Sequence, residues 1–408
     1  MSNSLLTIDM VTREALRVAH EKLQFIGTVD RQYDDSFGNA GAKIGSSLRV
    51  RKPNQYTRTT GSRVMDVQDQ TEASSTITVA TQDHVDMRFN SSEFALSIDD
   101  FSKRYIVPAV SVLASGIESD FLAFATKATW NCAGSAGTAM TDLVVPGAAR
   151  AALNRSLAPK DGNRCIQADS STMGSMVNGL KGLFQDSAQI KDQYREGMIG
   201  RTAMADWYEN DRMWTLTNGS DVTCTMAAAA AVTDGGNVMT MASLAAAPAV
   251  GAVFTVPGVY QCHPETKATL GNLQQFVITN GTTTIQTVSP TIYLTGPRQN
   301  VCSAAGAQLT PATFNGTGIV PVFVGSASTS YIQGLMYHKE AFQFITADLP
   351  IMGDAETCVR RVQDGLSMRV WRASDIRNDE LLMRIDILYG MAALRPEWAS
   401  RMVGAASA

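Results

Sequence analysis

The stretch SIDDFSKRYIVPAVSVLASGIESDFLAFATKATW, residues 97–130, carries the longest one-sided apolar pattern in the chain. Its apolar residues follow one another at steps of four and three, which places them on one face of a helix with 3.6 residues per turn. A helix of this length, rising about 1.5 Å per residue, needs a sheet or other helices along its side. The stripe consists of Ile106, Val110, Leu113, Ile117, Phe121, Phe124 and Ala128.

The start of this helix carries two kinds of signal. Ser97 and Asp100 form a capping-box pattern, and Asp99 adds negative charge near the positive end of the helix dipole. Pro108 lacks a backbone N–H and crowds the turn before it. We therefore expect a kink at Pro108, or a short lead-in turn before the main helix.

The composition is that of a folded protein. The 408 residues are enough for two or three domains, and 45% hydrophobic with 18% charged residues excludes a disordered chain. A net charge of −4 argues against a protein that grips nucleic acid through its phosphates. The N-terminus shows no signal-peptide pattern, and Pro248 and Pro257 argue against a membrane span in the least charged window, 235–263.

The sequence offers little catalytic chemistry. It has four histidines and lacks a phosphate-binding loop, a G-x-S-x-G elbow and an H-E-x-x-H helix. The six cysteines have no C-x-x-C spacing, and we expect reduced, buried thiols. His338 and Glu340 form the one dense titratable cluster, a weak candidate for a general base and its orienting acid. We expect no enzyme, no cofactor and no metal.

Upstream of residue 97, the patterns predict a helix at 7–25 and strands near 43–53, 76–79 and 84–89. A long loop with few apolar anchors follows residue 53, and loops of this length often reach a partner. We interpret the basic residues here as a solvated edge, as partners for acids on a neighbouring subunit or, least favoured, as nucleic-acid contacts. This basic run is Arg49, Arg51, Lys52, Arg58 and Arg63.

Downstream, helices are predicted at 146–157 and 170–184, and mixed turns and short strands at 194–210. Charges nearly vanish between 217 and 328, where short strands predict a separate small β-barrel that interrupts the surrounding pattern. Within it, Asn280 and Gly281 are predicted to form a type I′ turn. Near the C-terminus, 365–372 and 381–390 are predicted to pair in a buried sheet, joined through Asn378 and Asp379.

This order of elements resembles the major capsid protein fold of tailed phages and herpesviruses, an α+β fold. Several stretches are similar to the coat-protein family of short-tailed Salmonella-type phages, which carries an inserted β-barrel domain. They run in family order between residues 43 and 397: KIGSSLRVRKP, SIDDFSKRYIVPA, YREGMIGR, VFTVPGVYQCHPETKATLGNLQQFVIT, LMYHKEAF and GLSMRVWRASDIRNDELLMRIDILYGMAALRPE.

The resemblance implies a domain organisation. An N-terminal arm helix would occupy 1–32, an extended hairpin loop 33–80, and a peripheral domain 81–144, with its spine helix at 97–130. The axial domain would begin at 145–216, the inserted β-barrel would span 217–328, and the chain would return to the axial and peripheral domains at 329–408.

The resemblance also implies a function. The chain would be a structural major capsid protein that assembles in the bacterial host cytoplasm, as pentamers and hexamers, into the icosahedral shell of a virion around double-stranded DNA. Implied partners are copies of itself, a separate scaffolding protein, a portal protein and weakly contacted DNA, with decoration proteins left open and no membrane. The alternatives are a tail or adhesion protein and, less favoured, an enzyme with an inserted β-barrel.

The resemblance makes six residues candidates for contacts between subunits. Asp234 lies in the short turn TDGGNVMT, where relatives carry a projecting acidic loop, and the shortness of this turn weakens the case for a salt bridge there. Lys43 and Lys52 are lysines of the loop, but a catalytic Glu for a crosslink is not identified, so we expect a shell without covalent links. The six candidates are Arg49, Arg51, Lys52, Arg58, Arg63 and Asp234.

Overall fold

The computed structural model describes residues 8–31, 47–61, 65, 67, 72–90, 105–180, 199–227, 232–311, 319–351, 357–363, 366–375, 377–378 and 380–406. The chain divides into two compact units. The first unit comprises Met1–Val50, Ser74–Phe121 and Phe342–Leu394, and the second comprises Arg51–Ala73, Leu122–Ala341 and Arg395–Ala408. The described residues form a mixed α+β structure, as predicted.

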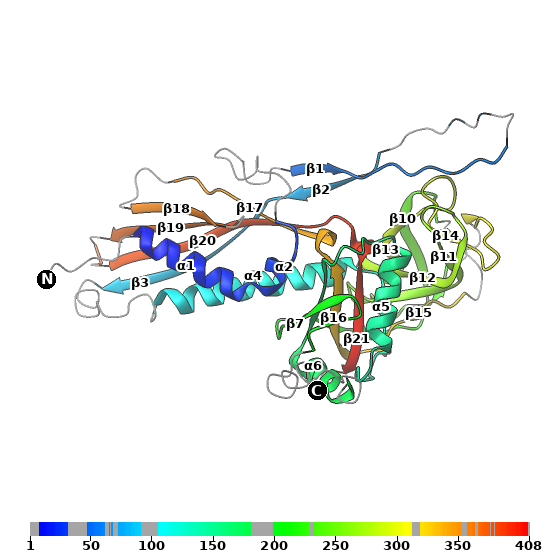
Figure 1. The fold of residues 1–408 in the computed structure, drawn as a ribbon, viewed down its shortest axis with the longest axis horizontal. Helices are drawn as coiled ribbons and strands as arrows, with labels where there is room; N and C mark the ends of the chain where they lie inside the picture. Colours follow the sequence, from blue (N-terminus) through cyan, green and yellow to red (C-terminus); the bar gives the residue numbers. More distant parts are fainter. Residues whose placement is uncertain are drawn as a thin grey trace. The chain divides into compact units, whose positions relative to one another are not determined.

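A five-stranded antiparallel sheet forms the first unit (Figure 1). Its central strand β20 pairs with β3, β17 and β19, and β18 pairs with β19. The predicted C-terminal hairpin is confirmed, because β19 and β20 pair from Arg369 opposite Asp386 to Asp375 opposite Glu380. The strands are β3 (Thr81–Asn90), β17 (Phe342–Ala347), β18 (Thr357–Gln363), β19 (Leu366–Asp375) and β20 (Glu380–Ala393).

The described residues of this unit include the helices α1 (Ile8–Lys22) and α2 (Gln24–Thr28) and the part of α4 (Val107–Ala128) up to Phe121. The helix α1 packs on β18 and β19. On α4, the stripe residues from Ile106 to Phe121 are buried as predicted, whereas Phe124 and Ala128 are half-buried. The Phe121 ring lies 4.9 Å from Phe25 of α2 and 5.5 Å from Phe344 of β17, centroid to centroid. By length and composition α4 could cross a membrane, yet these contacts place its stripe in the core.

The predicted lead-in turn is present at the start of α4. Pro108 lies in the first helical turn, where its missing N–H costs no intrahelical bond, and Tyr105 and Ile106 form a π-type turn before it. The predicted capping residues Ser97, Asp99 and Asp100 lie outside the described residues.

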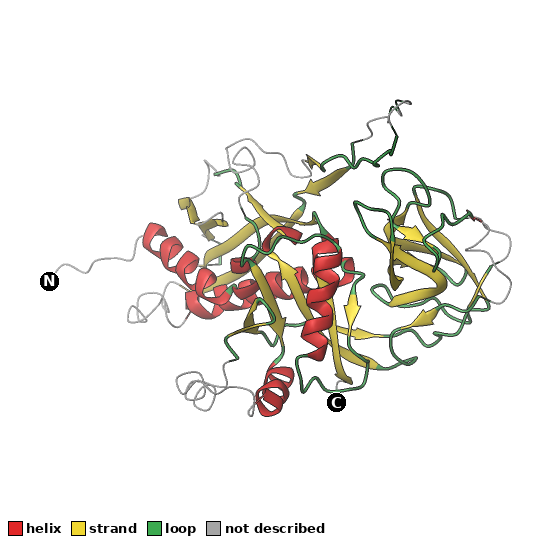
Figure 2. Cartoon of the chain, turned by 45° about the vertical axis from the view of Figure 1, so that its right-hand side comes forward, coloured by secondary structure: helices red, strands yellow, loops and turns green. Residues whose placement is uncertain are grey.

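The second unit contains a mixed sheet in the order β4-β21-β16-β5-β7-β6, with β8 also paired to β16. The helix α5 (Val144–Arg155) lies against β21, β4 and β16 (Figure 2), and α6 (Ser170–Leu180) follows β5. Both helices match the predicted positions. The strands are β4 (Cys132–Ala133), β5 (Arg164–Ala168), β6 (Arg201–Thr202), β7 (Ala205–Glu209), β8 (Thr215–Thr217), β16 (Ser330–His338) and β21 (Ala399–Ala406).

A seven-stranded sheet of the second unit lies between β8 and β16 in the sequence. Its order is β14-β11-β12-β13-β10-β9, with β15 paired to β11. It has its own hydrophobic core, which includes Met239, Phe254, Phe276 and Ile278. The strands are β9 (Thr225–Met226), β10 (Gly236–Ala242), β11 (Val253–Cys262), β12 (Thr269–Gly281), β13 (Ile285–Ile292), β14 (Val301–Cys302) and β15 (Val322–Phe323).

The predicted turn at Asn280 and Gly281 is wrong. Both residues still belong to β12, where Gly281 lies opposite Gln286, and the chain reverses after Thr282. The amide of Thr282 donates to Ile285 O at 2.8 Å, and its hydroxyl accepts from the amide of Ile285 at 3.0 Å. A side chain on Gly281 would collide with that of Gln286. Glycine is therefore explained here by close packing, which a turn motif in the sequence cannot distinguish.

Candidate subunit interface

A two-stranded sheet fixes the base of the predicted extended loop. It consists of β1 (Ser47–Arg51) and β2 (Ser74–Thr78). Val50 and Ile77 are 7% and 0% exposed and belong to a hydrophobic cluster with Ile345 and Leu388 of the first unit. The alternation of apolar and polar residues places these two side chains inward, so the core of the first unit anchors both ends of the loop.

Beyond this base, the described residues of the loop form no helix or strand. The amide of Lys52 donates to Ala73 O at 2.7 Å, and residues 52–61 then contain no regular element. Large side chains are open to solvent here: Tyr56 is 57% exposed, Met65 87% and Val67 77%. Burying such a side chain against a partner stabilises a complex by about 1.5–3 kcal/mol. These exposed apolar side chains of the loop could be buried against a partner, and a loop that only faces solvent would not need them.

The basic candidates of the loop divide into two groups. Arg49 donates from Nε to Ser74 Oγ at 2.7 Å, and Arg51 pairs with Glu72 at 3.3 Å, so both tie the two legs of the loop together. Arg58 is exposed and has no ion-pair partner among the described residues, and Lys52 is half-buried. Arg63 lies outside the described residues.

The acidic candidate Asp234 is exposed, but its carboxylate is already occupied. One oxygen accepts from the amide of Leu294 at 2.6 Å, and the other accepts from the Thr295 hydroxyl at 2.8 Å. These bonds connect the turn before β10 to the residues after β13. Asp234 thus stabilises its own sheet, a role that the sequence did not reveal.

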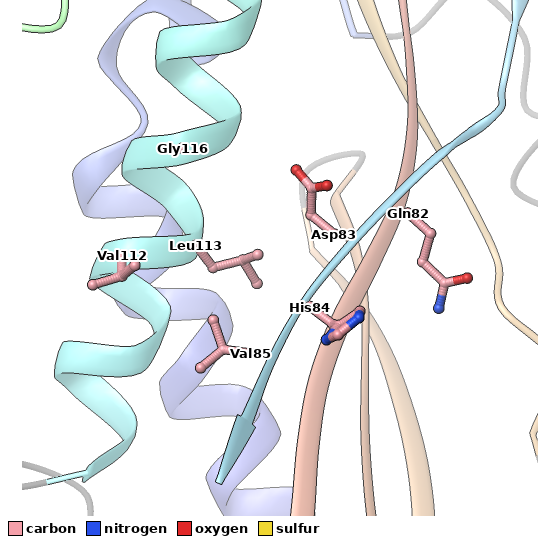
Figure 3. A pocket seen from close by; sticks show the side chains of 7 residues that line it. All are labelled: Gln82, Asp83, His84, Val85, Val112, Leu113 and Gly116. Carbon is pink, nitrogen blue, oxygen red and sulfur yellow. The ribbon is translucent and has the colours of Figure 1, made fainter.

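A cavity of about 310 Å³ lies between β3 and α4 of the first unit. Figure 3 shows Val85 directed toward the helix and Gln82 and His84 directed to the other side of β3. Val112 of α4 is 67% exposed at its wall. The cavity is lined by Gln82, Asp83, His84, Val85, Val112, Leu113 and Gly116.

The polar groups of this cavity are engaged within the first unit. Asp83 accepts from the Tyr389 hydroxyl at 2.8 Å; burial, followed by this hydrogen bond, raises the pKa of Tyr389. Gln82 donates to Asp386 at 3.0 Å, and His84 lies 3.1 Å from Asp86.

The weak candidate pairing of His338 with the Glu340 carboxylate is not formed. His338 is 1% exposed, and its Nε2 lies 3.0 Å from Asp161 Oδ1. Glu340 contributes only its backbone amide, which donates to Nδ1 at 3.3 Å and so leaves the ring proton on Nε2. The ring also packs edge-on against Trp398 of η4 (Pro396–Trp398), at 5.5 Å between centroids. This geometry is that of a packed, hydrogen-bonded histidine.

Acid is expected to weaken the second unit through Asp161. Burial raises the pKa of this carboxyl, but hydrogen bonds from Asn163 and His338 outweigh burial and lower it from 3.8 to about 2. Because the folded-state pKa lies below the unfolded one, Asp161 stabilises the fold above pH 3.8, and this contribution is lost as the pH falls toward 2. Its side chain is 43% exposed, so we expect about 1 kcal/mol or less.

Denaturant titrations of wild type and Asp161→Asn at pH 7 and pH 2.5 measure this contribution. The difference between the two proteins should be present at pH 7 and shrink at pH 2.5. A difference that stays constant across this range would contradict the assignment.

The family model of the P22 coat protein, gene protein 5, matches residues 8–404. The chain belongs to the P22 coat protein family. It is accordingly a structural major capsid protein of a phage virion, and it forms a homo-oligomeric capsid. The spine-helix pattern and the six similar stretches in the sequence led to the same family.

Three solved structures are similar to this chain at low sequence identity. A chain from Mycobacterium phage Che8 is 10% identical, with TM-score 0.47 and coverage of 92% of this chain and 89% of that chain. The capsid of cyanophage P-SCSP1u is 11% identical, with TM-score 0.43 and coverage of 91% of this chain and 86% of that chain. The head of Helicobacter pylori bacteriophage KHP40 is 10% identical, with TM-score 0.42 and coverage of 91% of this chain and 87% of that chain. No curated protein matches the sequence.

Sequence reasoning on this P22 coat protein family member missed three exposed apolar residues of the loop. Charge drew attention to Arg49, Arg51 and Arg58, whereas Tyr56, Met65 and Val67 carry the unusual exposure. A signal existed, because these residues interrupt an otherwise polar stretch. Their exposure depends on what the rest of the fold leaves uncovered, and the sequence does not state that.

Proposed function

We propose that this chain assembles as pentamers and hexamers into an icosahedral shell around a double-stranded DNA genome, and that residues 52–73 bind an adjacent subunit. The observation that carries the proposal is the exposure of Tyr56, Met65 and Val67 on a connection with a buried base. A shell made of many copies gains stability from modest contacts repeated at every joint.

The basic candidates take different parts in this proposal. Arg58 is available for an acid on the neighbour, with Lys52 and Arg63 as further contacts. Arg49 and Arg51 brace the two legs of the loop through Ser74 and Glu72, which keeps the binding segment extended. Asp234 is kept as an exposed acid that makes a weaker contact, because its oxygens already accept two hydrogen bonds.

Other partners are part of the proposal through the family. They are a separate scaffolding protein, a portal protein, packaged DNA in weak contact and, as an open question, decoration proteins. Assembly would take place in the cytoplasm of the host, and the proposal assigns catalysis to no residue. Electron microscopy of the protein expressed with and without a scaffolding protein tests this part, since shells of uniform size should require the scaffold.

Shortening the loop tests the subunit contact directly. In this variant Asn-Gly replaces residues 53–72 and closes a two-residue hairpin, because the backbones of Lys52 and Ala73 are already hydrogen-bonded at 2.7 Å. Most of the described residues removed are exposed, and shortening the loop lowers the entropy cost of closing it, so we expect the free energy of unfolding to change by about 2 kcal/mol or less. Closed shells should be lost, as measured by sedimentation and electron microscopy.

A second variant separates the length of the loop from its side chains. Here a glycine-serine segment of the same length replaces residues 53–72. We expect this variant to fold and to fail in assembly as the shortened one does. Shells of normal size and yield from either variant would overturn the proposed contact.

We also propose that residues 217–328 form the inserted domain of the family. In support, the incoming and outgoing segments run side by side: the amide of Asn218 donates to Thr329 O, and the amide of Ser328 donates to Gly219 O. The separate hydrophobic core of the seven-stranded sheet is further support. Limited proteolysis at this stem should release a fragment of about this span that stays folded; rapid degradation of the fragment would count against a separate domain.

A further inference from the structure

Cys262 and Cys302 lie on neighbouring strands of the seven-stranded sheet. In the antiparallel pair of β11 and β14, Tyr260 lies opposite Cys302, and the amide of Cys262 donates to Asn300 O at 3.0 Å, which continues this register. Side chains alternate between the two faces of a strand. The two thiols are therefore diagonal neighbours on the same face, opposite to the face of Val301, which belongs to the core of the sheet.

Both thiols are sheltered from solvent and interact with each other. Cys262 is 3% exposed and Cys302 0%. Burial, followed by a hydrogen bond with the Cys302 thiol, raises the pKa of Cys262, while the nearby amine of Lys267 opposes the rise. In the closed sheet the Cys262 thiol is thus protonated and held beside Cys302, and its reaction needs a local opening.

The short length of β14 and its position at the end of the strand order favour a local opening of this strand. This strand has two residues and lies at the end of the strand order, paired to β11. Short edge elements open locally at a much lower free-energy cost than the fold as a whole. The same freedom lets Cys302 move toward Cys262, an adjustment that a diagonal pair requires before it meets disulfide geometry.

We propose that Cys262 and Cys302 form a redox-sensitive pair that closes to a disulfide when the shell leaves the reducing cytoplasm and meets a peroxide. The Cys262 thiolate attacks hydrogen peroxide, the O–O bond breaks, and a sulfenic acid and hydroxide form. The Cys302 thiolate then attacks this sulfur, the S–O bond breaks, and hydroxide leaves as the S–S bond forms. Two protons from the thiols complete two waters, so two thiols are oxidised and one peroxide is reduced.

The bond would fasten an edge of the sheet. It closes the chain between residues 262 and 302 and restricts the unfolded state of this segment. This inference goes beyond the shell-forming role and does not depend on the contact made by the extended loop. Its failure would leave the proposed function untouched.

Oxidation of the purified full-length protein with hydrogen peroxide, against a phosphine-reduced sample, tests the pair. We expect the count of alkylatable thiols after denaturation to fall by two from the six in the chain. Digestion with trypsin and chymotrypsin cuts after Tyr260 and Lys267, so the peptide 261–267 should be found linked to the peptide that contains Cys302. Oxidation should raise the thermal midpoint of this sheet by about 5 °C.

Three variants complete the test. Cys262→Ala and Cys302→Ala should each abolish the linked peptide and the rise in midpoint. Cys224→Ala, which replaces a buried thiol in the hydrophobic core of this sheet, should keep both. The wild-type peptide analysis stands even where a variant fails to fold. Recovery of Cys262 and Cys302 as free thiols, as sulfinic acids or in links to other cysteines would overturn the proposal.

Discussion

Asp386→Ala is expected to lower the free energy of unfolding of the first unit by about 3–5 kcal/mol. The Asp386 side chain is 0% exposed and that of Arg369 4%. Arg369 donates from Nε to Asp386 Oδ1 at 3.0 Å and from a second guanidinium nitrogen to Oδ2, while Gln82 also donates to this carboxylate. Removing the acid leaves a buried guanidinium without its counter-charge between β19 and β20. Denaturant titration of the purified variant measures the loss.

A more exposed ion pair, which joins β20 to β3, provides the matched control. Arg384 and Asp86 pair at 2.6 Å with side chains 33% and 51% exposed, so Asp86→Ala should cost about 1 kcal/mol or less. The double variant Arg369→Met/Asp386→Leu should recover most of the stability, because apolar residues of similar volume replace a buried pair at little cost. If Asp386→Ala and Asp86→Ala lowered the free energy of unfolding equally, burial would not determine how much the pair of Arg369 and Asp386 stabilises the fold.

The buried faces of the helices were predictable because their patterns depend on burial alone, although the single helix predicted at 7–25 is divided at Leu23 into α1 and α2. Thr12, Leu16, Ala19, Leu23 and Ile26, the shared face expected at the N-terminus, are all buried. The same is true of α4 from Ile106 to Phe121. A helix that packs one face on a core must repeat apolar residues at its own period, so the sequence records the face even when the partner is unknown.

Local motifs were less reliable than periodicity. Asn378 does lie in the turn between β19 and β20, where its side chain bonds Asp375. Asn280 and Gly281 form an Asn-Gly dipeptide, which is a strong turn signal in a sequence, but both residues lie in β12. Gly281 is still paired with Gln286 of β13, and the chain reverses only after Thr282. A dipeptide is a local signal, and the register of a strand is set by its whole inward face.

The interface candidates were predictable only in part, because charge is visible in a sequence and pairing is not. Arg49 and Arg51 were correctly expected on the outward face of a strand, yet their partners Ser74 and Glu72 are more than 20 residues away. His338 finds its acid 177 residues away in Asp161. Neighbours in sequence, such as Glu340, are therefore poor guides to side-chain partners.

Glu118→Ala is expected to loosen the N-terminal helices from α4 and to cost about 2–4 kcal/mol. Glu118 is 0% exposed within the apolar face of α4. Its carboxylate accepts from the amides of Phe25 at 2.7 Å and Gln24 at 3.2 Å. These amides lie at the start of α2, where the N-cap residue Leu23 has no side-chain oxygen to accept from them. The Glu118 carboxylate of α4 accepts their hydrogen bonds instead, and its negative charge interacts favourably with the positive end of the α2 dipole.

Two readouts distinguish this role from general packing. Hydrogen exchange at the amides of Gln24 and Phe25 should accelerate by about 30- to 700-fold in Glu118→Ala, the factor that a loss of about 2–4 kcal/mol gives at 1.4 kcal/mol per tenfold. Glu118→Gln keeps one acceptor oxygen and should show a smaller acceleration, and Ser119→Ala, on the exposed side of the same turn, should leave exchange unchanged. Unchanged protection at Gln24 and Phe25 in Glu118→Ala would mean that the carboxylate does not hold α2. The Glu118 contact therefore adds a polar link between α2 and α4 to the direct packing of α1 on β18 and β19.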